Sequence, residues 1–153
     1  MIPTLYVMVG VPGSGKSTFA DEYLQGTYIS RDAIRFSIIN EHDKYFAKED
    51  LVFAEFVKEI QNNIKLGKDV IADATHISGS SRRKLISAIG KLNYNIIFVV
   101  MATDFNTCIE RNNKRMNRLK VPLNTMQQMQ AHFTYPNKED FKNCKGVWII
   151  NGC

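Results

Sequence analysis

The nine residues GVPGSGKST, at positions 10–18, decide the fold of this 153-residue chain. Their spacing, G-x-x-x-x-G-K-[ST], is that of a P-loop. The loop follows an apolar run at 4–9 (TLYVMV), which predicts a buried strand, and precedes a helix predicted over 16–25. Strand, glycine loop and helix in this order are the context that a phosphate-binding loop requires. A simple glycine turn between strand and helix would leave the lysine and the serine unexplained.

The residues of the loop have separate physical roles in holding a nucleoside triphosphate. Glycines at 13 and 15 let backbone N–H groups turn inward around phosphate oxygens, and the start of the following helix adds its positive end. The lysine would reach the β- and γ-phosphates, and the serine hydroxyl would ligate Mg²⁺. We therefore expect ATP and Mg²⁺ as ligands. The predicted nucleotide-binding residues are Gly13, Ser14, Gly15, Lys16, Ser17 and Thr18, with Ser17 as the metal ligand.

Outward from the loop, strands and helices alternate along the chain. Further strands are predicted at 27–30, 70–72, 96–101 and 147–150. Helices are predicted at 33–40, 48–66 and 80–92, from 105 onward, and after Pro122. Several strands are apolar on both faces, which indicates a parallel sheet covered by helices on both sides. We expect one α/β domain over residues 1–153.

The basic charge is concentrated in one segment. The net charge is +5, from 20 basic and 15 acidic residues. An acid-free stretch holds five of the basic residues, and such a cluster suits a polyphosphate or nucleic-acid partner, although a solvated helix end is the plainer alternative. If the preceding helix persists, three arginines share one face and could act as a lid, predicted at about 111–122. The residues are Arg111, Lys114, Arg115, Arg118 and Lys120, with the arginines as the shared face.

Other classes of protein are disfavoured by what the sequence lacks. The longest apolar run, 96–102, is too short to span a membrane, and the N-terminus has no basic n-region, so we expect a cytoplasmic protein. Three cysteines make no even disulfide framework. The chain has no Asn-Lys-x-Asp motif and no Asp-x-x-Gly switch, which disfavours a GTPase. A compact P-loop domain with a late basic segment is typical of a phosphotransferase.

Two acidic residues follow predicted strands, where a parallel sheet has its ligand crevice. Asp32, after the second strand, is placed to accept a hydroxyl proton, or else it caps the next helix. Arg35, one turn later, either grips an acceptor phosphate or lies on the surface. Asp73, after the third strand, either orients Arg35 or holds metal-bound water, with a turn aspartate as the plain alternative. The basic run at 82–84 is expected to be solvated.

These segments together resemble the 5′-hydroxyl polynucleotide kinase domain of bacteriophages, within the adenylate-kinase-like P-loop kinases. The matching pieces are residues 10–18, 29–38, 70–85, 111–115 and 121–126. The resemblance implies a three-layer sandwich around a five-stranded parallel sheet of order 2-3-1-4-5. It also implies a general base at Asp32, an acceptor-phosphate contact at Arg35 and an active-site acid at Asp73. On the lid, Arg115 matches the arginine on the transferring phosphate and Arg111 its companion near the nucleotide.

Three functions follow as hypotheses, in decreasing order of preference. The first is Mg-ATP-dependent transfer of the γ-phosphate to the 5′-hydroxyl of DNA or RNA. The second keeps this chemistry with a small-molecule acceptor, such as a nucleoside or a sugar. The third is a nucleotide-gated binding protein that transfers nothing. The chain ends at Cys153 without an Asp-x-Asp-Gly-Thr motif, so we expect this polypeptide to lack the 3′-phosphatase domain that some of these phage enzymes carry.

Overall fold

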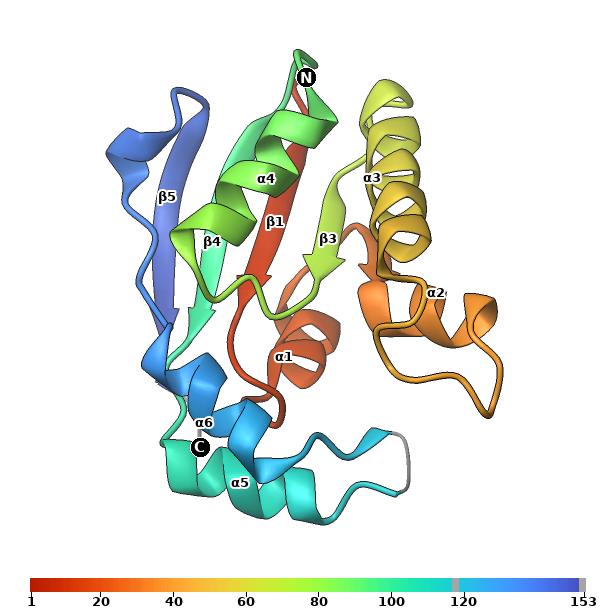
Figure 1. Cartoon of the computed structure of the whole chain (residues 1–153). Helices are drawn as coiled ribbons and strands as arrows, with labels where there is room; N and C mark the ends of the chain where they lie inside the picture. The colour runs from red at the N-terminus through yellow and green to blue at the C-terminus, as the bar shows by residue number, and fades with distance from the viewer. Residues whose placement is uncertain (117–118, 152–153) are drawn as a thin grey trace.

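Five parallel strands form the central sheet in the predicted order, β2-β3-β1-β4-β5 (Figure 1). The computed structural model describes residues 1–116 and 119–151. The arrowheads of β1, β3 and β4 all point toward the same end of the molecule, where α2, α5 and α6 lie. The strands are β1 (Thr4–Val9), β2 (Thr27–Ser30), β3 (Val70–Asp73), β4 (Asn95–Met101) and β5 (Cys144–Ile150).

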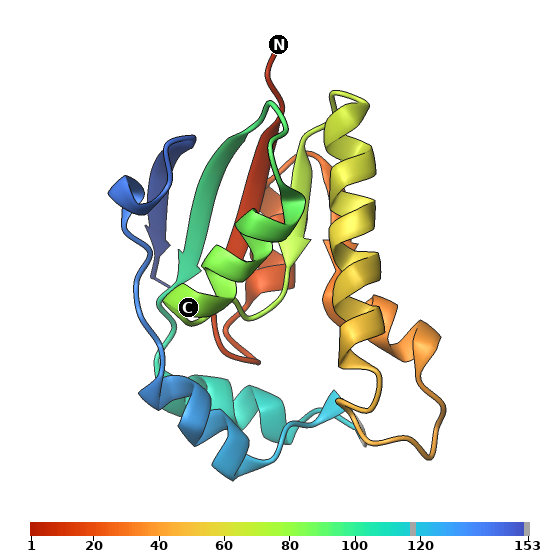
Figure 2. The same cartoon turned by 45° about the horizontal axis from the view of Figure 1, so that its top comes forward.

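Helices cover both faces of this sheet, as predicted. The long helix α3 (Glu49–Lys65) and α4 (Gly79–Ile89) lie on one face, and α1 (Lys16–Tyr23) lies on the other (Figure 2). The remaining elements gather beyond the carboxyl ends of the strands or beside β5. They are α2 (Arg31–Ile38), α5 (Phe105–Asn113), α6 (Leu123–Ala131) and the short 3-10 helix η2 (Lys138–Asp140).

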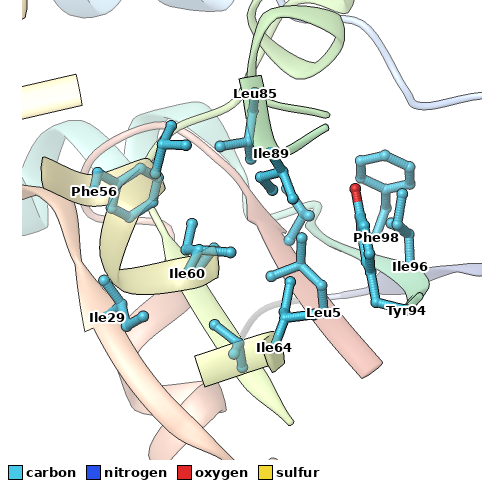
Figure 3. Packing of buried hydrophobic residues seen from close by; sticks show 14 of the residues in the cluster. Leu5, Ile29, Phe56, Ile60, Ile64, Leu85, Ile89, Tyr94, Ile96 and Phe98 are labelled. Carbon is cyan, nitrogen blue, oxygen red and sulfur yellow. The ribbon is translucent and has the colours of Figure 1, made fainter. Parts of the chain in front are cut away.

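Alternate residues of β1 pack into two different cores. Leu5 and Val7 face α3 and α4, where they meet Phe56 and Ile89 in the larger core (Figure 3). Met8 faces the opposite way and packs with residues of α1 in a smaller core. Burying one large aliphatic or aromatic side chain contributes roughly 1.5–3 kcal/mol, so the two cores hold the sheet rigid. The loops at its carboxyl edge are therefore carried on a fixed frame.

The helix after the second strand begins earlier than predicted. α2 starts at Arg31 because the Ser30 hydroxyl accepts a hydrogen bond from the Ala33 backbone N–H at 3.1 Å and caps the helix. Asp32 lies within the first helical turn. The alternative that Asp32 serves only as the helix cap is therefore wrong.

The helix that begins the basic stretch ends before most of that stretch. α5 is capped by Asp104 and stops at Asn113. The shared arginine face was predicted for the case that this helix persists; the helix does not persist, and Arg115 lies beyond its end. Arg118, the third member of that face, lies outside the described residues.

A second basic run also differs from expectation. Arg82, expected to be solvated, is buried at 3% exposure. Its guanidinium donates to the His76 carbonyl oxygen and to the Thr134 hydroxyl oxygen, both at 2.8 Å. This arginine ties the loop after β3 to the segment after α6.

Within 1–116 and 119–151, no helix is long and apolar enough to span a membrane.

Candidate active site

A cleft of about 1370 Å³ lies at the carboxyl edge of the sheet. Its walls come from the P-loop, from α2 and the loop after it, from the end of β3, and from the segment that follows α5. All the residues predicted from the sequence to bind nucleotide or acceptor line this one cleft. They are Gly13, Ser14, Gly15, Lys16, Ser17, Thr18, Asp32, Arg35, Asp73, Arg111 and Arg115.

The P-loop backbone has the shape of an anion cradle. Gly13 and Gly15 have φ values of 84° and 94°, a left-handed conformation that glycine adopts at little cost. A Cβ on Gly13 would lie 2.5 Å from the Cys108 carbonyl oxygen, so α5 approaches the loop as closely as glycine allows. The Thr103 hydroxyl braces the loop by donating to the Ser14 carbonyl oxygen at 2.6 Å. These features fit the phosphates of a nucleotide.

Lys16 lies at the base of the cleft with charged groups from three other segments around it. Its Nζ donates to the Val11 carbonyl oxygen at 3.2 Å. Burial lowers the pKa of Lys16; the carboxylates of Asp73 and Asp32 act in the opposite direction, and Arg115 adds to the lowering. The cation that would hold the phosphates is therefore electrostatically coupled to the predicted base and to the predicted lid arginine.

The residues present also fit a magnesium ion that is bound together with a nucleotide. Ser17 and Thr18 are exposed in the first turn of α1, on the cleft wall. Among the described residues, no group of three or more His, Cys, Asp or Glu side chains could hold a metal ion. Mg²⁺ in nucleotide sites usually takes one or two protein ligands, with phosphate oxygens and waters completing its shell. The Ser17 hydroxyl suits such a partial site.

Asp32 lines the cleft and bonds the protein through one of its two carboxylate oxygens. Its side chain is 51% exposed. Oδ1 accepts hydrogen bonds from Arg35 Nη1 and from the Tyr45 hydroxyl. Within 1–116 and 119–151, no hydrogen bond or ion pair falls on Oδ2. The second oxygen is therefore available to a hydroxyl group in the cleft.

Arg35 is buried, and its hydrogen-bond donors are all engaged. The side chain is 5% exposed, and Nη2 lies 2.8 Å and 2.9 Å from the two carboxylate oxygens of Glu49. Nε donates to Glu49 Oε2 at 3.3 Å, and Nη1 donates to Asp32 and, at 2.8 Å, to the Tyr45 hydroxyl oxygen. A guanidinium has five N–H groups, so an acceptor phosphate would have to displace one of these partners.

The partner of Asp73 differs from the one predicted. Its Oδ2 accepts a hydrogen bond from the Tyr28 hydroxyl. Burial, together with this bond, raises the pKa of Tyr28 above its ordinary value, so the phenol remains a donor at neutral pH. The hypothesis that Asp73 orients Arg35 is wrong, because Glu49 and Asp32 hold that guanidinium. Asp73 is left facing the cleft near Lys16.

The last turn of α5 is bonded to the P-loop and to the segment that follows the helix. Arg111 Nη1 donates to the Gly13 carbonyl oxygen at 3.2 Å. The buried Asn112 amide donates to the Val121 carbonyl oxygen at 2.7 Å and accepts from the Val121 N–H at 3.0 Å. Arg115, on the exposed part between these bonds, has Nη1 3.5 Å from the Leu119 carbonyl oxygen.

Sequence reasoning missed four residues that organise the site. The sequence patterns place Glu49 in a predicted helix, Tyr28 in a predicted strand and Asn112 in the basic stretch. They make no prediction for the fourth residue, Tyr45. Only Glu49 carries a usable signal, because a carboxylate at the start of a helix is a common partner for an arginine one segment away. The other three are recognised by their contacts in the fold.

The profile of a family described as an AAA domain matches residues 5–136. The chain belongs to this family. A curated relative named as a bifunctional polynucleotide kinase/RNA ligase, from Autographa californica nuclear polyhedrosis virus, is 24% identical over 150 residues. That alignment covers 90% of this chain and 22% of the viral protein, so the chain spans about a fifth of its relative.

Solved structures show the same P-loop kinase fold. A chain in the structure of the Pnkp1/Rnl/Hen1 RNA repair complex superposes with a TM-score of 0.67 at 23% identity, over 93% of this chain and 47% of that one. A gluconokinase from Sinorhizobium meliloti 1021 superposes with a TM-score of 0.62 at 18% identity, over 99% of this chain and 84% of the other. The domain thus has the architecture of a kinase-type phosphotransferase.

Proposed function

We propose that this domain transfers the γ-phosphate of Mg-ATP to the 5′-hydroxyl of a polynucleotide, with Asp32 as the general base. The observation that supports this most is the placement of Asp32. Asp32 lines the same cleft as the P-loop, its Oδ2 accepts no hydrogen bond in the described structure, and its carboxylate is close enough to Lys16 to shift the pKa of that lysine. A base and a phosphate cradle in one cleft are what phosphoryl transfer to an alcohol needs.

The reaction is an in-line displacement in which atoms and charge balance. The acceptor oxygen forms a bond to the γ-phosphorus while the bond from that phosphorus to the β,γ-bridging oxygen breaks. The hydroxyl proton goes to Asp32 Oδ2, and ADP leaves with the bridging oxygen. Lys16 and the N–H groups around Gly13 and Gly15 stabilise the charge that moves onto the leaving diphosphate.

The remaining cleft residues hold and orient the reactants. The Ser17 hydroxyl would ligate Mg²⁺, which supplies charge neutralisation on the phosphate oxygens when it is bound. Asp73 faces the cleft beside Lys16 and would orient water in the metal shell. Arg111 stays with the P-loop through the Gly13 carbonyl, whereas Arg115 is exposed, keeps only a long hydrogen bond to the Leu119 carbonyl oxygen, and would meet the transferring phosphate. An arginine in that role is worth about 10³–10⁵ in rate.

Three aromatic residues that line the cleft near Asp32 favour a nucleic-acid acceptor. Phe36, Tyr45 and Phe46 line the cleft beyond Asp32, and Phe46 is 56% exposed. Aromatic rings bind nucleobases by stacking, independently of base sequence. The relative from the baculovirus is named for a polynucleotide kinase, which agrees with this choice.

A small-molecule acceptor is the second candidate, and the state of Arg35 favours it. This arginine would be the natural ligand for the phosphate that follows the first nucleotide, yet its donors are already bonded to Glu49, Asp32 and Tyr45. A nucleoside or sugar without a phosphate would need no rearrangement of this network. The structural likeness to a gluconokinase fits that alternative equally well.

Labelled ATP separates these candidates directly. The protein is mixed with [γ-³²P]ATP and Mg²⁺, and with a 5′-hydroxyl oligonucleotide, its 5′-phosphorylated counterpart, nucleosides or sugars. We expect label on the 5′-hydroxyl oligonucleotide and none on the phosphorylated one. Label on a nucleoside or sugar alone would establish the second candidate in its place.

Two variants test the proposed base. Asp32→Asn should retain ATP binding, measured by calorimetry, and lose transfer by about 10²-fold or more. Glu41→Gln is the matched control, because Glu41 also lines the cleft as an exposed acid but has no place in the mechanism. Equal activity of Asp32→Asn and wild type would exclude Asp32 as the base. Wild-type protein that binds ATP and labels no acceptor would instead indicate a nucleotide-gated binding protein.

A further inference from the structure

Tyr45 contacts the proposed base although it belongs to no helix or strand. It lies in the connection between α2 and α3, thirteen residues beyond Asp32, and its hydroxyl donates a hydrogen bond to Asp32 Oδ1. Burial and the nearby Asp32 carboxylate raise the pKa of Tyr45 above its ordinary value, so the phenol keeps its proton and acts as the donor. This hydrogen bond links the connection between α2 and α3 to the proposed general base.

The ring of Tyr45 is held on several sides, so its hydroxyl has a defined position. The Arg35 guanidinium lies 4.2 Å from the ring centroid, in a cation–π contact. Phe46 packs edge-on at 4.6 Å between centroids, and Phe36 packs edge-on at 6.0 Å. Asp32, by contrast, is half exposed on the first turn of a helix, and its carboxylate is held by Arg35 and Tyr45. The packed ring of Tyr45 therefore gives this exposed carboxylate a hydrogen-bond donor of defined position.

The choice of carboxylate oxygen matters for the chemistry. Tyr45 and Arg35 both bond Oδ1, so the carboxylate is held through one oxygen and the other is left for a group in the cleft that Asp32 lines. Without the phenol, Arg35 alone holds Oδ1, and the carboxylate gains freedom to rotate away from the acceptor hydroxyl. Small misplacements of a reacting group cost large factors in rate.

We propose that Tyr45 is a positioning residue, which directs Asp32 Oδ2 at the acceptor hydroxyl. This inference rests on the proposed function of Asp32 as the base, and it holds for any alcohol acceptor. Because Tyr45 acts through Asp32, its removal should affect the rate of the chemical step. Binding of Mg-ATP at the P-loop, on the other wall of the cleft, should stay unchanged.

Tyr45→Phe is the informative variant, because it removes only the hydroxyl and keeps the ring that Arg35 and Phe46 contact. We expect kcat to fall about tenfold or more, as for the loss of a hydrogen bond to a charged group, with KM for Mg-ATP within about twofold of wild type. Tyr135→Phe serves as the matched control, since Tyr135 is an exposed tyrosine that packs on Phe133 and lines no part of the cleft. Its kcat should equal that of wild type.

A double-mutant cycle tests whether Tyr45 acts through Asp32. Tyr45→Phe is compared with the parent protein in the wild-type background and in an Asp32→Ala background, using the residual transfer rate. We expect the tenfold effect to disappear in the Asp32→Ala background, because no carboxylate remains to be oriented. A purely structural role would leave the same fold-change in both backgrounds, and that result would overturn the proposal.

The outcomes also separate this inference from the proposed function. If the wild-type protein labels a nucleoside or sugar in place of an oligonucleotide, the cycle is measured on that acceptor, and the same expectation applies. An active wild type with unchanged kcat in Tyr45→Phe refutes the role of Tyr45 and leaves the kinase function intact. A raised KM for Mg-ATP with unchanged kcat would refute it as well, because the effect would then lie in nucleotide binding.

Discussion

Acid should destabilise this domain through His76, a residue that takes no part in the proposed reaction. His76 is buried at 4% exposure, and its Nδ1 lies 2.8 Å from the Met8 carbonyl oxygen. Since a carbonyl can only accept, Nδ1 carries the proton and Nε2 is bare. Nε2 is buried, with no hydrogen-bond partner in the described structure. Protonation there would place a charge and an unpaired N–H inside the core, beside the stacked ring of Phe56.

The size of this effect follows from the two pKa values. Burial lowers the pKa of His76 from 6.5 to about 4, and the nearby cations Arg31, Lys16 and Arg82 act in the same direction. An unfolded chain takes up this proton as the pH falls through about 6.5, whereas the folded chain resists until about 4. The unfolded state is therefore favoured progressively across that window. The difference between the two pKa values amounts to about 3 kcal/mol of stability.

Urea unfolding at a series of pH values measures this term, with His76→Asn as the comparison. Asparagine cannot titrate, and it tolerates the positive φ of 45° at this position. Carboxylates affect both proteins alike, so the quantity of interest is the difference in free energy of unfolding between wild type and variant. We expect that difference to shift by about 3 kcal/mol against the wild type between neutral pH and pH 4. Parallel curves would refute the reasoning.

Further predictions concern the P-loop, the end of α5 and the aromatic lining of the cleft. Gly13→Ala should lower the free energy of unfolding in urea by roughly 2–4 kcal/mol, because the added Cβ would lie 2.5 Å from a backbone carbonyl oxygen of α5. Gly67→Ala is the control: Gly67 has a similar φ but open space around it, so this variant should lose only about 1–2 kcal/mol. Asn112→Ala leaves the N–H and C=O of Val121 without their hydrogen-bond partners. This variant should have a lower kcat and should still bind ADP, as measured by calorimetry. Phe46→Ala should raise KM for a 5′-hydroxyl oligonucleotide about fivefold or more, and Phe46→Leu nearly as much; unchanged KM would argue against stacking.

The framework of the fold could be predicted because its signals are local. The strands are short apolar runs separated by amphipathic helices, and the P-loop is a contiguous motif, so the sheet and the donor site follow from neighbouring residues. β5 was recognised only from Val147 onward, since Lys145 and Gly146 interrupt its apolar pattern. The end of α5 was left open, because the apolar pattern stops at the basic stretch and gives no signal for where the helix ends.

The sequence predicted which of the candidate site residues meet in one cleft, but it did not predict their hydrogen-bond partners. Asp32, Arg35 and Asp73 reach the cleft because the carboxyl ends of parallel strands share one edge. Their hydrogen-bond partners come from other segments of the chain, many residues away. Glu49 lies fourteen residues from Arg35, and Tyr28 forty-five residues from Asp73. Hydrogen bonds at such separations depend on the packing of α2 against α3 and of β2 against β3, which periodicity does not specify.

Most of the residues that would meet the acceptor come from one uninterrupted stretch, 28–49, and part of it is the connection between α2 and α3. That connection supplies two aromatic rings, yet it contributes no strand to the sheet and no turn to the phosphate cradle. Because the same connection carries Tyr45, a change in this loop would alter both the lining of the cleft and the hydrogen bond to Asp32. A replacement loop that keeps a tyrosine at position 45 should therefore change which alcohol the proposed kinase accepts, while the P-loop at residues 10–18 is left as it is.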